Sequence, residues 1–593
     1  MGSIYRLFDS LGAHSMASRS FTGNPSQIII EQLVASGVRH LFYNPGSREA
    51  RFFDTLHSRP EISGVIGLHE GTVTAMAGGF AQVNSDPAVM SVHLGAGLAQ
   101  SLGQMINVWA ASLPVVMITF VGDTGSYADR ITLDLGHDVG PTSIGAPFMK
   151  ANWTVIDPGG LATAVDRALK VAMTPPIGPV HIAAYDRILG AEHITTSIIE
   201  GPPARPRAGY PDDSDVEEIA RTLHEAKRPL IYVGDGVNKS GAESQLAAIA
   251  DHFGTNVASM WGDLRGVSAA HPLHCGYFRG PVVDLEPDAI LAIGVRHGAS
   301  GNPADFDLFK TAKKIVAVGP DVEIFENIPG LDLAVMADEY RVIEKLALLA
   351  NSEYEAKAYD ERRQMSYKAA EKFRNDRRVE LQSPIEIPGH VRPIALLDAV
   401  DNGLEKLGGG IITTEQFAVP LEDVVAKPNG GSNTYIRPAG GSEGYGMGAP
   451  LGAKLAAPDT PVVGMVGDGS VYYSDSAFWS AAHHQIPVLY VVPNNSSYGI
   501  VAGAFAGADG VMKDTGEYAG VVLDGIDIVQ LAGSFGVEGR KVDDESEIDS
   551  AVQEGLDTVE REGRPMVLDV KLPLGVPAGG RPAKPIKFTD MNK

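Results

Sequence analysis

Short runs rich in valine and isoleucine alternate with helical patterns along most of this chain. In LPVVMITFVGD (113–123), RPLIYVGDG (228–236) and PVVGMVGDG (461–469), an uninterrupted apolar run stops at a Gly-Asp pair. Apolar runs without polar alternation are typical of strands that are buried on both faces of a parallel sheet. The sequence therefore predicts an α/β protein built from doubly wound parallel sheets.

The alternation falls into three segments, separated by two stretches that interrupt it. Residues 201–215 are rich in proline and glycine, as linkers are, and a charged stretch at 352–383 marks the second break. With 593 residues, the chain is long enough to bury several cores. We therefore predict three α/β domains, at 26–190, 216–351 and 390–575.

Charge and cysteine content exclude several classes of function. The formal net charge of −25 argues against a nucleic-acid partner, because such binding needs clustered Lys and Arg. The single cysteine, Cys275, excludes an internal disulfide, and we interpret it as a half-buried structural thiol. The N-terminal residues lack the apolar core of a signal peptide, and no long uncharged apolar stretch follows. We expect a soluble, cytoplasmic protein with no membrane partner.

The most informative stretch for chemistry is residues 467–499. An apolar strand ends at Asp468, a helical pattern follows, and a second strand ends at Asn495. A right-handed crossover puts both strand ends on the same sheet edge, so a carboxylate and an amide oxygen can approach a Mg²⁺ ion there. The neighbouring glycines and the start of the helix allow a phosphate to approach the backbone. Two ordinary strand-to-helix turns are the alternative, as at 234–236, where the same Gly-Asp-Gly has no second half.

This arrangement resembles the thiamine-diphosphate-dependent enzyme family, whose signature is GDG followed after a similar interval by NN. The resemblance implies thiamine diphosphate and Mg²⁺ as cofactors, with Asp468 and Asn495 as side-chain ligands of the metal. The other residues that it places against the metal or the cofactor are Ser497 through its carbonyl, Gly467, Gly469 and Ser470 at the diphosphate, Tyr498 beside them, and Gly441 at the aminopyrimidine.

An acid begins the helix that follows an apolar strand in LHEGTVTAMAGGFAQ (68–82). By itself, Glu70 is a first-turn acid that complements the helix dipole. In the family that the chain resembles, a glutamate in this place bonds the pyrimidine N1′ and helps to remove the C2 proton of the cofactor. The resemblance implies that role for Glu70, and burial would favour a carboxyl that shares a proton.

Two further loops resemble the benzoylformate decarboxylase branch of the family. NPGS (44–47) resembles a loop whose serine contacts the substrate carboxylate, and HLGAG (93–97) resembles a loop that carries a histidine. The resemblance implies Ser47 as a binder of the substrate and His93 as a proton donor or acceptor near C2. The alternatives are a turn serine and a hydrogen-bonded core histidine.

The sequence also departs from the family pattern. In AGGSEGYG (439–446), Glu443 stands where relatives place a bulky apolar side chain that supports the bent cofactor. A carboxylate there would be poorly solvated, so we expect either a shifted side chain or added acid-base chemistry from Glu443. The second catalytic histidine of the branch would fall near Gly301, and His297 is the nearest substitute.

The resemblance implies non-oxidative decarboxylation of a 2-oxo acid, with the product released or joined to an aldehyde acceptor. The alternatives are a carboligase similar to acetohydroxyacid synthases and a catalytically silent cofactor-binding protein. The resemblance also implies a homodimer or homotetramer, in which the first and third domains of different chains face each other at the dimer interface. Some relatives hold a nucleotide in the middle domain, and nothing in this sequence demands one.

Overall fold

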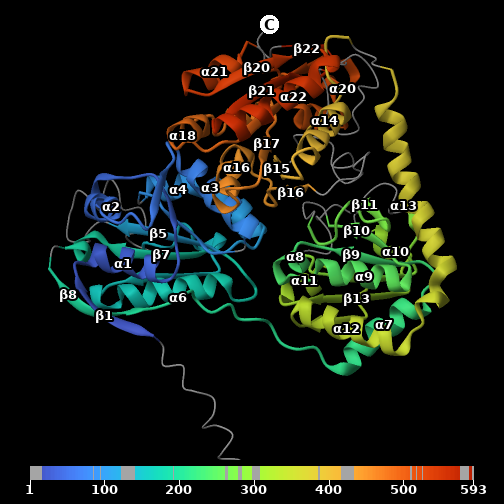
Figure 1. The fold of residues 1–593 in the computed structure, drawn as a ribbon, viewed down its shortest axis with the longest axis horizontal. Coiled ribbons are helices and arrows are strands. Elements are labelled where there is room, and N and C mark those ends of the chain that lie inside the picture. Colours follow the sequence, from blue (N-terminus) through green and yellow to red (C-terminus); the bar gives the residue numbers. More distant parts are fainter. Residues whose placement is uncertain are drawn as a thin grey trace, which may run out of the picture. The chain divides into compact units, whose positions relative to one another are not determined.

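A computed structural model describes most of the chain, and its ribbon is drawn in Figure 1. Three wholly parallel six-stranded sheets dominate it, so the predicted class of three doubly wound α/β domains is confirmed. Within the described ranges, no helix is both long and apolar enough to cross a membrane. The described residues are 17–84, 86–93, 95–121, 140–190, 192–260, 265–277, 284–296, 307–384, 388–415, 433–507, 510–515, 517–523, 525–573 and 587–589.

The first compact unit comprises residues 1–66, 87–102 and 114–206 and contains the first sheet. Its strands are β2 (His40–Tyr43), β3 (Ser63–Ile66), β4 (Ala88–Ser91), β5 (Val115–Val121), β6 (Ala151–Val155) and β7 (Val180–Tyr185). Its helices are α1 (Pro25–Ala35), α2 (Ala50–His57) and α6 (Leu161–Met173). The strand order is β3-β2-β4-β5-β7-β6, and every residue of the central β5 is buried, as the apolar run predicts.

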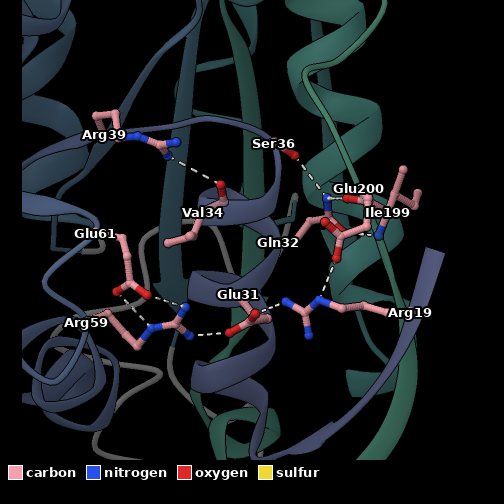
Figure 2. Close-up of polar contacts among 10 residues, drawn as sticks. All are labelled: Arg19, Glu31, Gln32, Val34, Ser36, Arg39, Arg59, Glu61, Ile199 and Glu200. Carbon is pink, nitrogen blue, oxygen red and sulfur yellow. Dashed lines mark hydrogen bonds and ion pairs between the residues drawn. The ribbon is translucent and has the colours of Figure 1, made fainter. Parts of the chain in front are cut away.

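An antiparallel ribbon lies beside this sheet and is fixed to α1 by polar contacts. Its strands are β1 (Ser18–Gly23) and β8 (Ile194–Ile199). Figure 2 shows the carboxylate of Glu31 between the guanidinium groups of Arg19 and Arg59. Gln32 exchanges two hydrogen bonds with the backbone of Ile199, at 3.0 and 2.9 Å. Because the Glu31 side chain is only 8% exposed, its charge depends on both arginines, which ties the ribbon to the helix.

The second compact unit comprises residues 67–86, 103–113 and 207–593 and contains the middle sheet. The strands of this sheet are β9 (Pro229–Val233), β10 (Asn256–Ser259), β11 (His274–Tyr277), β12 (Ala289–Ile293), β13 (Lys314–Gly319) and β14 (Leu333–Met336). The helices around it are α7 (Asp213–Glu225), α8 (Gly236–Ser240), α9 (Glu243–Phe253), α10 (Asp307–Lys310), α11 (Val322–Glu326), α12 (Glu339–Glu353) and α13 (Asp360–Leu381). The strand order β11-β10-β9-β12-β13-β14 reverses direction between β9 and β12, as in dinucleotide-binding folds.

The third sheet belongs to the same unit. Its strands are β15 (Ile411–Thr414), β16 (Thr434–Ile436), β17 (Val462–Met465), β18 (Leu489–Asn494), β20 (Glu538–Val542) and β21 (Met566–Lys571). The helices of this part of the chain are α14 (Pro393–Glu405), α16 (Tyr445–Ala456), α17 (Asp468–Val471), α18 (Ala477–His483), α19 (Gly499–Gly507), α20 (Val511–Thr515), α21 (Ile528–Ser534) and α22 (Ile548–Asp557). A separate two-stranded sheet pairs β19 (Glu517–Ala519) with β22 (Lys587–Thr589). The order β16-β15-β17-β18-β21-β20 matches that of the first sheet when each sheet's strands are counted along the chain.

Helix α3 (Glu70–Asn84) packs along α16, and Figure 1 shows the two side by side. Glycines allow their backbones to touch. A Cβ atom at Gly452 would lie 1.9 Å from the carbonyl oxygen of Met76, and one at Gly79 would lie 2.1 Å from the carbonyl oxygen of Ala449. The packing therefore fixes α3, which begins with Glu70, against α16, which lies beside the third sheet.

Candidate functional site

The third sheet reverses its strand order between β15 and β17. In parallel sheets, ligands bind in the crevice outside the carboxyl ends of the strands at such a point. Glu415 directly follows β15, Asp468 follows β17, and Asn495 follows β18, which is the next strand in the sheet. Asp468 and Asn495, which the sequence analysis identified, thus stand with Glu415 at the edge where this architecture binds ligands.

Asp468 is buried at this edge, with 3% of its surface exposed. The backbone N–H groups of Gly469 and Asn495 donate hydrogen bonds to its carboxylate, so the structure brings Asp468 and Asn495 together. Burial raises the pKa of Asp468 to about 7, and the nearby charge of Asp569 also raises it, while the backbone N–H groups of Gly469, Asn495 and Asp468 itself lower it. A cation beside this carboxylate would offset the cost of burying its charge.

The residues at this edge fit a magnesium ion. The buried side-chain atoms that have no hydrogen-bond partner in the described part of the chain include the Oδ2 atom of Asp468 and the hydroxyl of Ser497. Buried polar atoms are nearly always paired, so these two point to a bound group. The carbonyl of Ser497 accepts one bond, from the N–H of Gly499 at 2.9 Å, and its second lone pair remains for a ligand. Carboxylate, amide and carbonyl oxygens are the hard donors that Mg²⁺ prefers.

The loop that presents Asn495 and Ser497 is held in an unusual conformation. Ser496 has a φ of +53°, in the left-handed region that non-glycine residues seldom adopt. The side chain of Asn494 accepts a hydrogen bond from the Ser496 N–H at 3.0 Å and donates one to Asp569 at 2.8 Å. Such strain persists only where neighbouring bonds enforce it, and it clusters at functional sites.

The glycines of the Gly-Asp-Gly turn leave backbone accessible on one side only. Around the Cβ position of Gly467, no atom of a described residue other than its chain neighbours lies within 4 Å, so a ligand can approach that backbone. A Cβ at Gly469 would lie 2.8 Å from the ring of Tyr498, which closes the other side. The structure thus places Gly467, Gly469 and Tyr498 around the turn that carries Asp468.

The loop from Gly440 to Gly444 is clamped by two side chains of α4 (Ala96–Ala110). The amide of Asn107 donates to the carbonyl of Ser442 at 2.7 Å and accepts from the N–H of Gly440 at 2.9 Å. Gln104 donates to the carbonyl of Glu443 at 2.7 Å. Both amides are almost fully buried, so these bonds fix the backbone on either side of Glu443.

Glycine is required at two positions of this loop. Gly441 and Gly444 have φ values of +79° and +94°, and a Cβ at Gly444 would lie 2.7 Å from that of Tyr473. The buried carboxylate of Glu415 accepts from the N–H groups of Gly444 and Gly446, at 3.2 and 2.7 Å. The loop is therefore bonded from two sides, by α4 and by the end of β15.

The side chain of Glu443 points at the Gly-Asp-Gly turn that carries Asp468. Its Oε2 accepts a hydrogen bond from the hydroxyl of Ser470 at 2.6 Å. Burial raises the pKa of Glu443, and the Ser470 bond and the charge of Arg437 lower it. Glu443 and Ser470, which the sequence analysis connected only through the resemblance, are in direct contact.

Glu70 begins α3, as the sequence predicts, and its side chain is half-buried. The imidazole Nδ1 of His69 accepts a hydrogen bond from the N–H of Gly71 at 3.0 Å and so caps the helix start.

A second polar cluster lies at the matching position of the first sheet, where the strand order reverses between β2 and β4. The Nδ1 atom of His93 lies 3.0 Å from both carboxylate oxygens of Glu49, which is 1% exposed. A Cβ at Gly46 would lie 2.0 Å from the same ring, so glycine is required there. Ser47 begins the adjacent turn and is exposed.

Five residues of these clusters were missed in the sequence analysis. Glu49 follows Ser47 by two positions, and Asp569 and Glu415 are acids within or directly after apolar strands, which is a readable signal. Gln104 and Asn107 stand one turn apart on the mostly apolar helix α4. His297, the suggested substitute for a second histidine, lies outside the described residues.

Three family models match consecutive parts of the chain. The N-terminal TPP binding domain of thiamine pyrophosphate enzymes matches residues 24–135, the central domain matches 216–346, and the C-terminal TPP binding domain matches 425–570.

Similar proteins cover nearly the whole chain. Benzoylformate decarboxylase of Pseudomonas aeruginosa is 25% identical over 91% of this chain and 97% of its own length. The acetolactate synthase large subunit of Corynebacterium glutamicum is 26% identical over 94% of this chain and 88% of its own. The structure of the thiamine diphosphate-dependent 4-hydroxybenzoylformate decarboxylase of Rhodococcus jostii shares the fold, with a TM-score of 0.75, 23% identity, and coverage of 93% of this chain and 99% of that one.

Proposed function

The chain belongs to the thiamine pyrophosphate enzyme family, and we propose that it uses thiamine diphosphate and Mg²⁺ to decarboxylate a 2-oxo acid without oxidation. When bound, thiamine diphosphate supplies a nucleophilic carbon and accepts the electron pair left as carbon dioxide departs. The observation that carries the proposal is the buried carboxylate of Asp468, which lies against Asn495 and has one oxygen with no partner among the described residues.

The second compact unit would hold the cofactor. In this proposal, Asp468, Asn495 and the carbonyl of Ser497 bind Mg²⁺, because their oxygens are hard donors at one sheet edge. Residues proposed to contact the cofactor itself are Gly467, Gly469, Ser470 and Tyr498 at the diphosphate, with Gly441 and Glu443 at the rings.

Proton control would fall to Glu70 and His93. The carboxyl of Glu70 holds or releases the proton that activates the cofactor, and the hydroxyl of Ser47 binds the carboxylate of the substrate. His93 moves a proton to or from the product, while Glu49 orients its ring through Nδ1. The carboxyl of Glu443 is a further group that can exchange a proton in this site.

The relatives support two outcomes for the product. Those named benzoylformate decarboxylase favour release of an aldehyde, and those named acetolactate synthase favour transfer to a second carbonyl compound. We propose release of the aldehyde as the main reaction. We also propose that the protein is a homodimer or homotetramer, in which the first and third domains of different chains meet across the dimer interface. The domain limits 26–190, 216–351 and 390–575 and a cytoplasmic location remain predictions.

The test measures carbon dioxide release from pyruvate and from an aryl 2-oxo acid, each with and without an aldehyde acceptor. Asp468→Asn should abolish release and weaken Mg²⁺ binding by at least tenfold. The matched control is Asp401→Asn, which alters an equally buried aspartate of the same domain, bonded to Tyr435 at 2.7 Å. It should lower stability and leave metal affinity intact.

Three results separate the alternatives. Release that occurs only together with a ligated product would favour the carboligase. Saturable cofactor binding without turnover of any 2-oxo acid would favour a silent binding protein. Equal metal affinity in Asp468→Asn and the native protein would contradict the proposed site.

A further inference from the structure

Glu443 places a carboxyl group on a hydroxyl that the proposed function assigns to the diphosphate. The Ser470 hydroxyl donates to Glu443 Oε2 at 2.6 Å, a distance typical of strong bonds to a carboxylate. An anionic side chain thus occupies a donor that an anionic ligand would use. A resident acceptor and an arriving diphosphate cannot both take the single hydroxyl proton of Ser470.

The backbone around Glu443 cannot withdraw to relieve this competition. Asn107 bonds the residues before Glu443, Gln104 bonds its carbonyl, and Glu415 bonds Gly444 directly after it. All three of these side chains are at most 5% exposed. Any adjustment must therefore come from the Glu443 side chain itself, by rotation or by loss of charge.

We propose that Glu443 is an intramolecular competitor of the diphosphate group, which holds Ser470 in the cofactor-free protein and lowers the affinity of the site for thiamine diphosphate. The inference rests on the proposed function, because it uses Ser470 as a diphosphate ligand. It assigns Glu443 a role in loading the cofactor that is separate from any part in proton transfer.

The size of the effect follows from Coulomb's law. A carboxylate about 5 Å from a diphosphate charge, at an effective dielectric constant of about 20, weakens binding by about 300-fold. Glu443 is half-buried, so solvent screens part of this repulsion, and we expect a change of about tenfold.

The experiment titrates thiamine diphosphate into the native protein and three variants at fixed Mg²⁺, with binding followed by calorimetry. Glu443→Gln removes the charge and keeps the shape, and Glu443→Leu removes both charge and hydrogen bond. Both should lower Kd by at least tenfold. Glu443→Asp keeps the charge and should stay within threefold of the native protein.

The matched control is Glu339→Gln, which alters a buried carboxyl of the middle domain. Burial raises the pKa of Glu339 to about 8, so this variant also relieves a buried acid. Its Kd for the cofactor should stay within twofold of the native value. Thermal unfolding of every variant shows whether it is folded before binding is compared.

Several outcomes would overturn the inference. Unchanged or weaker binding in both Glu443→Gln and Glu443→Leu would do so, and so would a gain in Glu443→Leu alone, since charge would then not be the cause. Inorganic pyrophosphate with Mg²⁺ should show the same gain, and a gain confined to thiamine diphosphate would contradict repulsion of the diphosphate. Absence of saturable cofactor binding in all proteins would instead contradict the proposed function.

Discussion

Replacing Gly452 by alanine tests whether the close approach of α3 and α16 maintains the site. The added Cβ would lie 1.9 Å from the carbonyl oxygen of Met76 and 2.7 Å from the nitrogen of Phe80. Both atoms belong to the backbone of α3, so no side-chain rotation can relieve the clash. The helices must separate, and the start of α3, where Glu70 stands, must move with them.

The expected change in the free energy of unfolding follows from two opposing effects. Real Cβ atoms essentially never approach within 3.0 Å of another heavy atom, so the helix axes must part by about 1 Å. Overpacking of a core costs about 1–3 kcal/mol, and a backbone clash belongs at the upper end of that range. Alanine in place of glycine returns about 1 kcal/mol through helix propensity. We expect a net loss of about 2 kcal/mol.

Urea denaturation measures this loss, with Gly533→Ala as the matched control. Gly533 also lies in a helix, α21, and no atom lies within 4 Å of its Cβ position. That variant should gain about 0.5–1 kcal/mol. Gly452→Ala should in addition slow exchange of the cofactor C2 proton. If Gly452→Ala were as stable as Gly533→Ala, the argument from backbone contact would be wrong.

Three further predictions follow from buried groups. Complete burial lowers the pKa of His181 from 6.5 to about 4, so the unfolded chain binds the extra proton, and about 3 kcal/mol of stability is lost as pH falls from 6.5 to 4. His181→Gln should remove most of this pH dependence in urea titrations, and an unchanged slope would refute it. Burial raises the pKa of Cys275 to about 12, so Ellman's reagent should react with it only as the protein unfolds, and fast labelling of the native protein would contradict this. Glu49→Gln should lower kcat by tenfold or more with little change in KM, because His93 loses its orienting carboxylate. A fall in kcat that is fully accounted for by a fall in thermal stability would instead indicate a merely structural role.

The central strands of each sheet were predictable because burial on both faces makes them continuously apolar. β5 and β18 are examples, since sequence and burial agree along most of their length. Edge strands lack that signal. In β6 only the last residue is buried, and β16 has only three residues, so neither stands out in the sequence. The β1–β8 ribbon was missed because its partners are far apart in the chain.

The site was predictable where it depends on one local crossover. Asp468 and Asn495 meet because two neighbouring parallel strands deliver them to one edge, and the handedness of the connection determines which edge. The hydrogen bond between Asn107 and Gly440 could not be predicted, because it depends on how α4 packs against a loop that lies far from it in the sequence. The Glu49–His93 dyad is intermediate, since two adjacent strands bring it together but side-chain packing selects it.

The two Gly-Asp-Gly turns show why a motif needs its surroundings before it implies chemistry. Asp235 also stands at a point where strand order reverses, yet its carboxylate is bonded to the backbone and guanidinium of Arg265, at 2.9–3.2 Å. A Cβ at Gly234 would lie 2.3 Å from the carbonyl of Gly294, so backbone fills the space that a ligand would need there. Arg265 in turn donates to the backbone at the end of α3, so the middle-domain motif serves to hold that helix. Asp468, by contrast, keeps a buried oxygen that has no partner within the described ranges, and that difference in satisfied bonds, more than the shared letters, distinguishes a ligand site from a structural turn.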